Sequence, residues 1–460
     1  MIFLKKQLNQ MNKSQKKALT DIALITLSFL ISYVLSNAGV YILSGIVLIL
    51  CGLYVGVSLM ISERNILEPR GIFSLSWVSC IGISSLKLSF LQTEWEAVTW
   101  ICFYLIYVSF YLSFFLSGQK IKLPVRNDKG DCSPDSLFLV ILILTLISLL
   151  SFTAEILILG YVPLFTVDTP HAYSYFHVSG LHYFTVLCVL EPAFFTVYLF
   201  NRKTDTVLKK TLMIFCTAVC LMMPVLMVSR FQLVFSVSLA VLSFLIMEKV
   251  KLASYMTRRN ILIAAGGVAL LIISYVFITF ERAHSADYLA GIFEMKFPVP
   301  IAVSQPYIYI SNNFDNFNCL VKELPAHSYG MKQLFPVFAL TGLKFRVPEL
   351  VNYPIYVTKE ELTTVTMFYD AYYDFGVPGC VILSIILGIL YSVLEKLLKE
   401  RRDPCIILIG AQLYTYLILA FFTTWFSNPT TWFYFGVCVV IQLILWYSKK
   451  TKMKRSGSHG

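Results

Sequence analysis

The segment Leu221–Leu242, LMMPVLMVSRFQLVFSVSLAVL, contains a single charged residue, Arg230, between two apolar runs. With their flanking residues, both runs are long enough to enter a lipid bilayer. The apolar residues are continuous rather than alternating, and backbone groups in lipid must be hydrogen-bonded internally, so helices are favoured over a closed barrel. The segment therefore predicts two membrane-spanning helices joined by a tight turn at Arg230.

The rest of the chain repeats this pattern. Of its 460 residues, 57% are hydrophobic and 14% are charged, and the mean hydropathy is +0.73. We predict an all-α, polytopic integral membrane protein that forms a single membrane domain over residues 1–460, with about twelve spans. The third span is the weakest, because it contains Lys87 and several serines. The predicted spans cover residues 18–36, 38–61, 72–90, 97–117, 137–159, 181–200, 211–228, 231–248, 261–280, 375–394, 405–425 and 431–447.

Basic residues gather in alternate connecting segments. Examples are NKSQKK near the N-terminus, GQKIKLPVRNDKGD after the fourth predicted span, and KKTKMKR near the C-terminus. Short basic loops stay in the cytoplasm, so both termini are predicted to be cytoplasmic. Together with attraction to anionic lipid headgroups, this topology accounts for the net charge of +11 without nucleic acid as a partner.

The longest segment on the other side of the membrane is predicted at residues 281–371, where it would cap an active site. A loop of this length without secondary structure is unusual. Its stretches LAGIFEMKF and MKQLFPVFALTGLKF predict short amphipathic helices that lie on the membrane or over a cavity. Prolines are expected to break the segment into short pieces. These prolines are Pro298, Pro300, Pro306, Pro325 and Pro336.

Arg230 has two interpretations. It either ends a helical hairpin and extends to the lipid headgroups, or it contacts an anion inside the helix bundle. Ionisable residues at membrane depth are costly and usually face a partner or a cavity. The planar guanidinium suits phosphate because it donates two parallel hydrogen bonds.

A second polar cluster, YVFITFERAHSADY, follows the predicted span 261–280. If helicity continues, Glu281 and His284 share one helix face and Arg282 points elsewhere. The cluster is either an ordinary polar helix end or a site at the bilayer surface, with a cation for phosphate and a base beside it. Lys296 and Arg346 add positive charge to the same loop.

The stretch FYDAYYDFGVPG leads into the predicted span 375–394. Asp374 either orients an acceptor hydroxyl or pairs with an arginine, or it caps the N-terminus of that helix. The chain has no HExxH motif, no DxD motif and only scattered histidines. We therefore predict no metal site and no cofactor.

With about twelve spans, one long late loop, and the motifs VSRFQLVF, YIYISNNFDNFN and YYDFGVPG, the chain resembles the Wzy-type oligosaccharide repeat-unit polymerases. These are GT-C-like integral membrane glycosyltransferases that build O-antigen, capsule or related surface polysaccharides. The resemblance covers most of the second half of the chain, and the first half is similar only in hydropathy. It implies glycosyl transfer at the outer face of the bacterial cytoplasmic (inner) membrane. Donor and acceptor would both be glycans on undecaprenyl pyrophosphate, and a flippase and a chain-length regulator would be partners.

The resemblance also implies two tasks for the protein, because the pyrophosphate is already a good leaving group. The site must stabilise developing negative charge and take a proton from the attacking hydroxyl. Candidates for the pyrophosphate are Arg230 and Arg282. The candidate bases are His284 or Asp374, with Glu281 or His327 as support. The other candidate substrate-binding residues are Lys296, His327, Arg346 and Tyr373.

Two other functions remain open. A glycan ligase has the same topology and the same need for arginine. A flippase or other transporter also fits the span count, although transporters more often show two similar halves.

Overall fold

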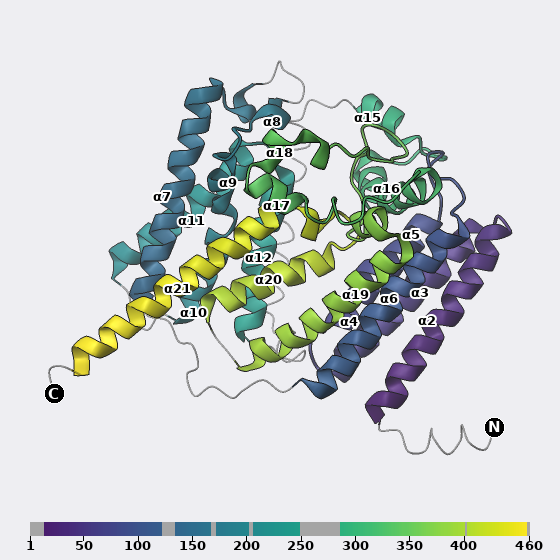
Figure 1. The fold of residues 1–460 in the computed structure, drawn as a ribbon, viewed down its shortest axis with the longest axis horizontal. Coiled ribbons are helices and arrows are strands. Elements are labelled where there is room, and N and C mark those ends of the chain that lie inside the picture. Colours follow the sequence, from purple (N-terminus) through teal and green to yellow (C-terminus); the bar gives the residue numbers. More distant parts are fainter. Residues whose placement is uncertain are drawn as a thin grey trace. The chain divides into compact units, whose positions relative to one another are not determined.

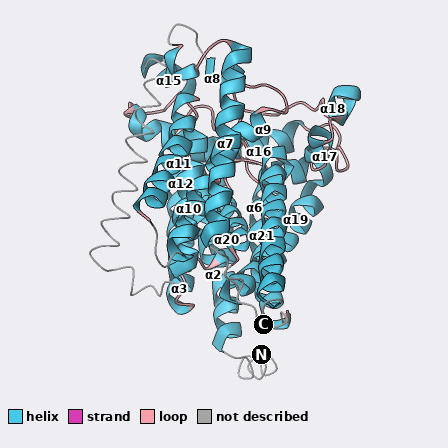
Figure 2. Ribbon diagram, turned by 90° about the vertical axis from the view of Figure 1, so that its left-hand side faces the viewer, coloured by secondary structure: helices cyan, strands magenta, loops and turns pink. Residues whose placement is uncertain are grey.

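The computed structural model describes residues 13–121, 134–166, 172–201, 206–248, 286–400 and 403–457 (Figure 1). In these residues the secondary structure is helical, and the only strand-like pairing is an isolated bridge between Ser89 and Met295 (Figure 2). The predicted all-α class is confirmed for the described residues.

Nine helical segments in the described ranges are long and apolar enough to cross a membrane. Each overlaps one of the predicted spans, so the chain has the helices of a polytopic membrane protein. They are α2 (Lys13–Asn37), α3 (Tyr41–Ser62), α6 (Ala97–Lys120), α7 (Pro134–Leu159), the stretch His182–Asn201, α11 (Val207–Leu226), α12 (Arg230–Glu248), α19 (Tyr369–Glu400) and α21 (Pro429–Gly457).

The three other predicted spans have different outcomes. Residues 72–90 correspond to a broken helix made of α4 (Pro69–Phe73), the π-helix η1 (Ser74–Val78) and α5 (Ser79–Ser85). Residues 405–425 correspond to the shorter helix α20 (Pro404–Ile418). The span 261–280 lies outside the described residues.

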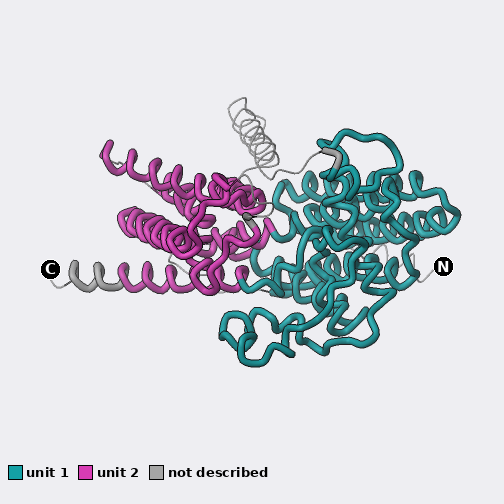
Figure 3. The backbone as a smooth tube through the Cα atoms, turned by 90° about the horizontal axis from the view of Figure 1, so that it is seen from above, with its two compact units in different colours: residues 1–122, 286–395, 416–429 teal, residues 123–285, 396–415, 430–460 magenta. Residues whose placement is uncertain are grey.

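The chain groups into two compact units, shown in different colours in Figure 3. Unit 1 comprises residues 1–122, 286–395 and 416–429, and unit 2 comprises residues 123–285, 396–415 and 430–460. Each unit is described by itself below.

Small residues let the helices of unit 1 approach closely. Gly45, Gly52 and Gly56 of α3 face the broken helix, and α2, α3 and α6 lie side by side in Figure 1. A Cβ atom on Gly52 would lie 2.8 Å from the backbone nitrogen of Ser79 and 2.9 Å from the carbonyl oxygen of Ser74. In lipid, where hydrophobic exclusion does not drive helices together, such close backbone packing is a main source of association.

The broken helix runs the length of the unit 1 bundle. At its start, Glu68 caps α4, Arg70 pairs with Glu68 at 2.6 Å, and the Arg70 guanidinium lies over Tyr111 in the second half of α6. At its other end, Ser84 bonds Asp315 and Lys87 lies over Trp95, just before α6 begins. Its 17 residues, from Pro69 to Ser85, would rise about 25 Å. The segment is therefore antiparallel to α6.

The predicted loop 281–371 contains several helices in its described part. LAGIFEMKF overlaps α15 (Ala286–Phe293), and MKQLFPVFALTGLKF contains α17 (Phe335–Leu340) and most of α18 (Leu343–Arg346). The expectation that Pro306 breaks the chain is wrong, because Pro306 lies inside the 23-residue helix α16 (Ile301–Glu323). Proline costs one backbone hydrogen bond there, and the extensive polar packing of α16 described below compensates for this loss.

In unit 2, α7 and α11 run parallel. Asp135 and Lys209, in their first turns, are joined at 2.8 Å. Near their other ends, Leu164 of η2 (Pro163–Phe165) packs against Val228, in the turn after α11. Because α12 begins directly after that turn, it runs antiparallel to both helices.

Candidate functional site

The helix α16 is unusually polar for a buried element. Every residue of its SNNFDNFN stretch, from Ser311 to Asn318, is buried. Buried polar side chains need hydrogen-bond partners. The sequence therefore requires neighbouring segments to fold onto α16.

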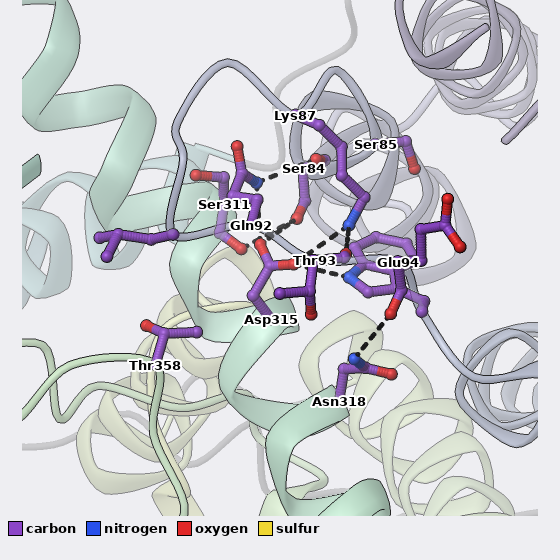
Figure 4. Close-up of polar contacts among 12 residues, drawn as sticks. Ser84, Ser85, Lys87, Gln92, Thr93, Glu94, Ser311, Asp315, Asn318 and Thr358 are labelled. Carbon is purple, nitrogen blue, oxygen red and sulfur yellow. Dashed lines mark hydrogen bonds and ion pairs between the residues drawn. The ribbon is translucent and has the colours of Figure 1, made fainter. Parts of the chain in front are cut away.

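Asp315 is the centre of one such arrangement (Figure 4). Its Oδ1 atom accepts from Trp95 Nε1 at 2.7 Å and lies 3.3 Å from Lys87 Nζ. Its Oδ2 atom accepts from Gln92 Nε2 at 2.8 Å and from Ser84 Oγ at 3.2 Å. Lys87 also donates to the carbonyl of Thr93 and lies over the Trp95 ring. The carboxylate thus fixes the whole link between α5 and α6.

Tyr307 completes this arrangement from about two turns earlier in α16. Its hydroxyl donates to Gln92 Oε1 at 2.6 Å and accepts from the backbone nitrogen of Leu88 at 2.9 Å. Burial raises the pKa of the Tyr307 phenol, so it stays protonated and keeps its donor role at neutral pH.

Three asparagines of α16 hold two further segments. Asn316 donates to the carbonyls of Leu362 and Thr364 at 2.7 and 2.8 Å, and its Oδ1 accepts from the backbone nitrogen of Thr358. Asn312 accepts from Thr358 Oγ1 at 2.6 Å, and Asn318 accepts from Thr99 Oγ1 at 2.8 Å. Asn312, Asp315, Asn316 and Asn318 thus make α16 a scaffold that binds other segments of the protein itself.

The chemically available groups lie beside this scaffold, in what we call the Lys332 cluster: Lys332, Asp370, Tyr353, Tyr356 and Tyr373. Lys332 Nζ lies 3.7 Å from Asp370 Oδ1 and 5.1 Å from the centre of the Tyr373 ring. The rings of Tyr353 and Tyr356 lie 5.9 and 6.1 Å from that of Tyr373. The Lys332 side chain is 18% exposed. A partly exposed cation among aromatic rings suits a ligand with both anionic and ring-shaped parts.

A short turn from His327 to Gln333 presents Lys332. The fully buried carboxylate of Asp374 accepts from the backbone nitrogens of Lys332 and Gln333 at 3.0 and 2.9 Å, and from Ser328 Oγ. His327 Nδ1 lies 3.2 Å from the carbonyl of Tyr373. Because three donors occupy the Asp374 carboxylate, its geometry favours a positioning role over that of a base.

Gly376 makes room for this turn. Its φ of +63° lies in the left-handed region, and a Cβ atom there would lie 3.1 Å from the His327 ring. Glycine adopts this conformation without steric cost. Three of the predicted site residues, His327, Tyr373 and Asp374, are therefore brought together at the start of α19.

The remaining predicted residues of unit 1 lie elsewhere. Lys296 is half-buried, and its Nζ atom lies about 6 Å from the rings of Tyr41 and Phe90. Arg346 is exposed at the end of α18. The contacts of the described residues link neither of them to the Lys332 cluster.

Arg230 belongs to unit 2, where it is the first residue of α12 and is 8% exposed. The predicted tight turn is present between Leu226 and Arg230, and it contains Val228 with a φ of +54°. This conformation is strained for a β-branched residue, and such strain concentrates at functional sites. Glu281, Arg282 and His284 lie outside the described residues.

Lys332 is not among the residues predicted for the site. No local pattern distinguishes it, because its partner Asp370 is 38 residues further along the chain. Across the described residues, no group of three His, Cys, Asp or Glu side chains could hold a metal ion.

The chain was also compared with known proteins. No protein-family model, no curated protein and no solved structure matches it.

Proposed function

We propose that this protein joins oligosaccharide repeat units carried on undecaprenyl pyrophosphate into a surface polysaccharide at the outer face of the bacterial cytoplasmic membrane. The proposal assigns both termini to the cytoplasm and the α16 end of unit 1 to the outer side. The nine candidate spans support a membrane-embedded protein, and the alternating basic segments support this orientation.

The observation that carries the proposal is the Lys332 cluster. Glycosyl transfer from a lipid pyrophosphate needs little covalent chemistry from the protein, because the leaving group is already activated. It needs cations near the phosphates and surfaces that orient two sugar chains. Lys332 supplies a cation, and its tyrosine neighbours supply flat amphipathic surfaces, at a position held by Asp374 and α16.

The proposal is tested first in cells. Deletion of the gene should leave surface glycan that carries a single repeat unit. Loss of all exported glycan would instead identify a flippase. Full-length glycan that fails to reach its final acceptor would identify a ligase.

The second test uses the purified full-length protein with a synthetic lipid-linked repeat unit. Lys332→Met should lower the rate of polymer formation by at least about tenfold, because the loss of one well-placed electrostatic group costs this much or more. Lys332→Arg should retain most of the rate. The matched control is Lys344→Met, which removes another lysine that lies over an aromatic ring, that of Phe345 in α18. Equal rates for Lys332→Met and Lys344→Met would refute the role of the cluster.

A further inference from the structure

A second constellation lies in unit 2, among residues that were not predicted for the site. His182 Nδ1 lies 3.1 and 3.2 Å from the two carboxylate oxygens of Glu155, a residue 27 positions earlier in the chain. Glu155 is fully buried near the end of α7 and also accepts from the backbone nitrogen of Val178 at 3.0 Å. The His182 side chain is 21% exposed.

This geometry determines the tautomer of the neutral imidazole. A carboxylate only accepts hydrogen bonds, so the proton of the neutral ring sits on Nδ1 and the lone pair sits on Nε2. No hydrogen bond of Nε2 is present among the described residues. A buried carboxylate that orients an accessible imidazole in this way is the arrangement that general bases use in hydrolases and transferases.

The pair lies at the same end of unit 2 as Arg230. Glu155 is near the end of α7, and His182 begins the short helix α9 (His182–Thr185), which packs against it. The segment after α7 reaches Leu164, which packs against Val228 in the turn before Arg230. The segment after α9, η3 (Val186–Val189), packs against α12. One end of unit 2 thus combines a base with a buried guanidinium.

We infer that His182 is the catalytic base for the acceptor sugar hydroxyl and that Glu155 is its positioning residue. This inference rests on the proposed function. In the step, the acceptor oxygen forms a bond to the anomeric carbon of the donor glycan, and its proton passes to His182 Nε2. The bond from that carbon to the pyrophosphate oxygen breaks, and its electron pair leaves with the pyrophosphate. The acceptor is therefore a sugar hydroxyl of a glycan on a lipid carrier. Protonated His182 then returns its proton to solvent.

The test exploits the two nitrogens of the ring. His182→Asn places an amide donor where Nδ1 lies and removes Nε2, so it can keep the bond to Glu155 while it deletes the base. In the purified full-length protein with the synthetic lipid-linked repeat, this variant should lose about 100-fold or more of the polymerisation rate, the usual contribution of a general base. Its melting temperature should stay close to that of the wild type. His177→Asn, which changes the adjacent ring 5.1 Å away, is the matched control and should retain most of the rate.

Chemical rescue separates a base from a merely structural residue. His182→Ala should recover part of its activity when imidazole is added, in proportion to the neutral fraction of that imidazole. Glu155→Gln, which retains His182, should lower the polymerisation rate, and added imidazole should not restore it. A His182→Asn variant that keeps more than half of the wild-type rate, or a His182→Ala variant that imidazole does not rescue, would overturn the inference. Failure of the proposed function would appear differently, as a wild-type protein that forms no polymer.

Discussion

Asp315 and Asp374 are both enclosed carboxylates, but their partners give them different tasks. Asp315 balances the charge of Lys87, whereas Asp374 accepts from two backbone nitrogens and a serine hydroxyl. A buried charge whose partner is removed is strongly destabilising, because its desolvation is no longer compensated. Of these two residues, Asp315 is therefore the one at which a small chemical change should have the larger effect on folding.

Asp315→Asn should lower the free energy of unfolding by about 3–5 kcal/mol, because Lys87 is then left buried without its counter-charge. Adding Lys87→Met to this variant should restore part of the loss. Thermal and denaturant unfolding of the purified protein would measure both effects. The exposed pair between Lys209 and Asp135 is the control, and Lys209→Met should cause no measurable change. Additive effects of Lys87→Met and Asp315→Asn would show that the two residues are not coupled.

Residue patterns predicted part of the candidate site. The stretch FYDAYYDFGVPG contains Tyr373 and Asp374, and both lie where the site is built, because their motif begins a helix and keeps them together. Lys332 and the pair of Glu155 and His182 could not be found in this way. Each of these contacts joins separate elements, and only the path of the folded chain brings their partners together.

The broken helix from Pro69 to Ser85 shows why an element that crosses a bundle can be only a weak candidate for a span. Its glycines and serines lower its hydropathy, yet they are the residues that allow α3 to approach closely. Lys87 also lowers the hydropathy of the predicted span 72–90, although it is buried against Asp315 and not exposed to lipid. Hydropathy measures preference for lipid, and this segment is surrounded by protein. The nine apolar helices could be predicted because lipid selects their composition directly.

Gly52→Ala tests this close packing. The added methyl group would meet the backbone of Ser79 and Ser74, which cannot move aside like a flexible side chain, so the variant should lose about 1–3 kcal/mol of stability. Gly436→Ala in α21 is the control, because a Cβ atom there has no neighbour within 4 Å. A melting temperature for Gly52→Ala equal to that of the control would contradict the predicted contact between α3 and the broken helix.

Each unit has two distinguishable ends, and this permits a test of the whole topology. In unit 1, the α16 end contains Lys87 and the start of α19, and the opposite end contains Arg70 and the end of α3. In unit 2, the Arg230 end contains His182, and the opposite end contains the pair of Asp135 and Lys209. The basic segments predict that the α16 end of unit 1 and the Arg230 end of unit 2 each lie on the outer side of the membrane.

Single cysteines at exposed positions can test this prediction. Glu360→Cys reports on the α16 end and Ser179→Cys on the Arg230 end, whereas Arg64→Cys and Val207→Cys report on the opposite ends. We expect a membrane-impermeant maleimide to label the first two variants in intact spheroplasts and the last two only after permeabilisation, because the basic segments retain the opposite ends in the cytoplasm.

The native cysteines of the described residues give little background in this experiment. All are buried except Cys319, which is half-buried, and burial raises the pKa of its thiol to about 11. The reactive species is the thiolate, so Cys319 reacts slowly at neutral pH, and the unmodified protein serves as the blank. Labelling of Glu360→Cys only after permeabilisation would place the α16 end in the cytoplasm and contradict the role assigned to Lys332. The same result for Ser179→Cys would contradict the role assigned to His182.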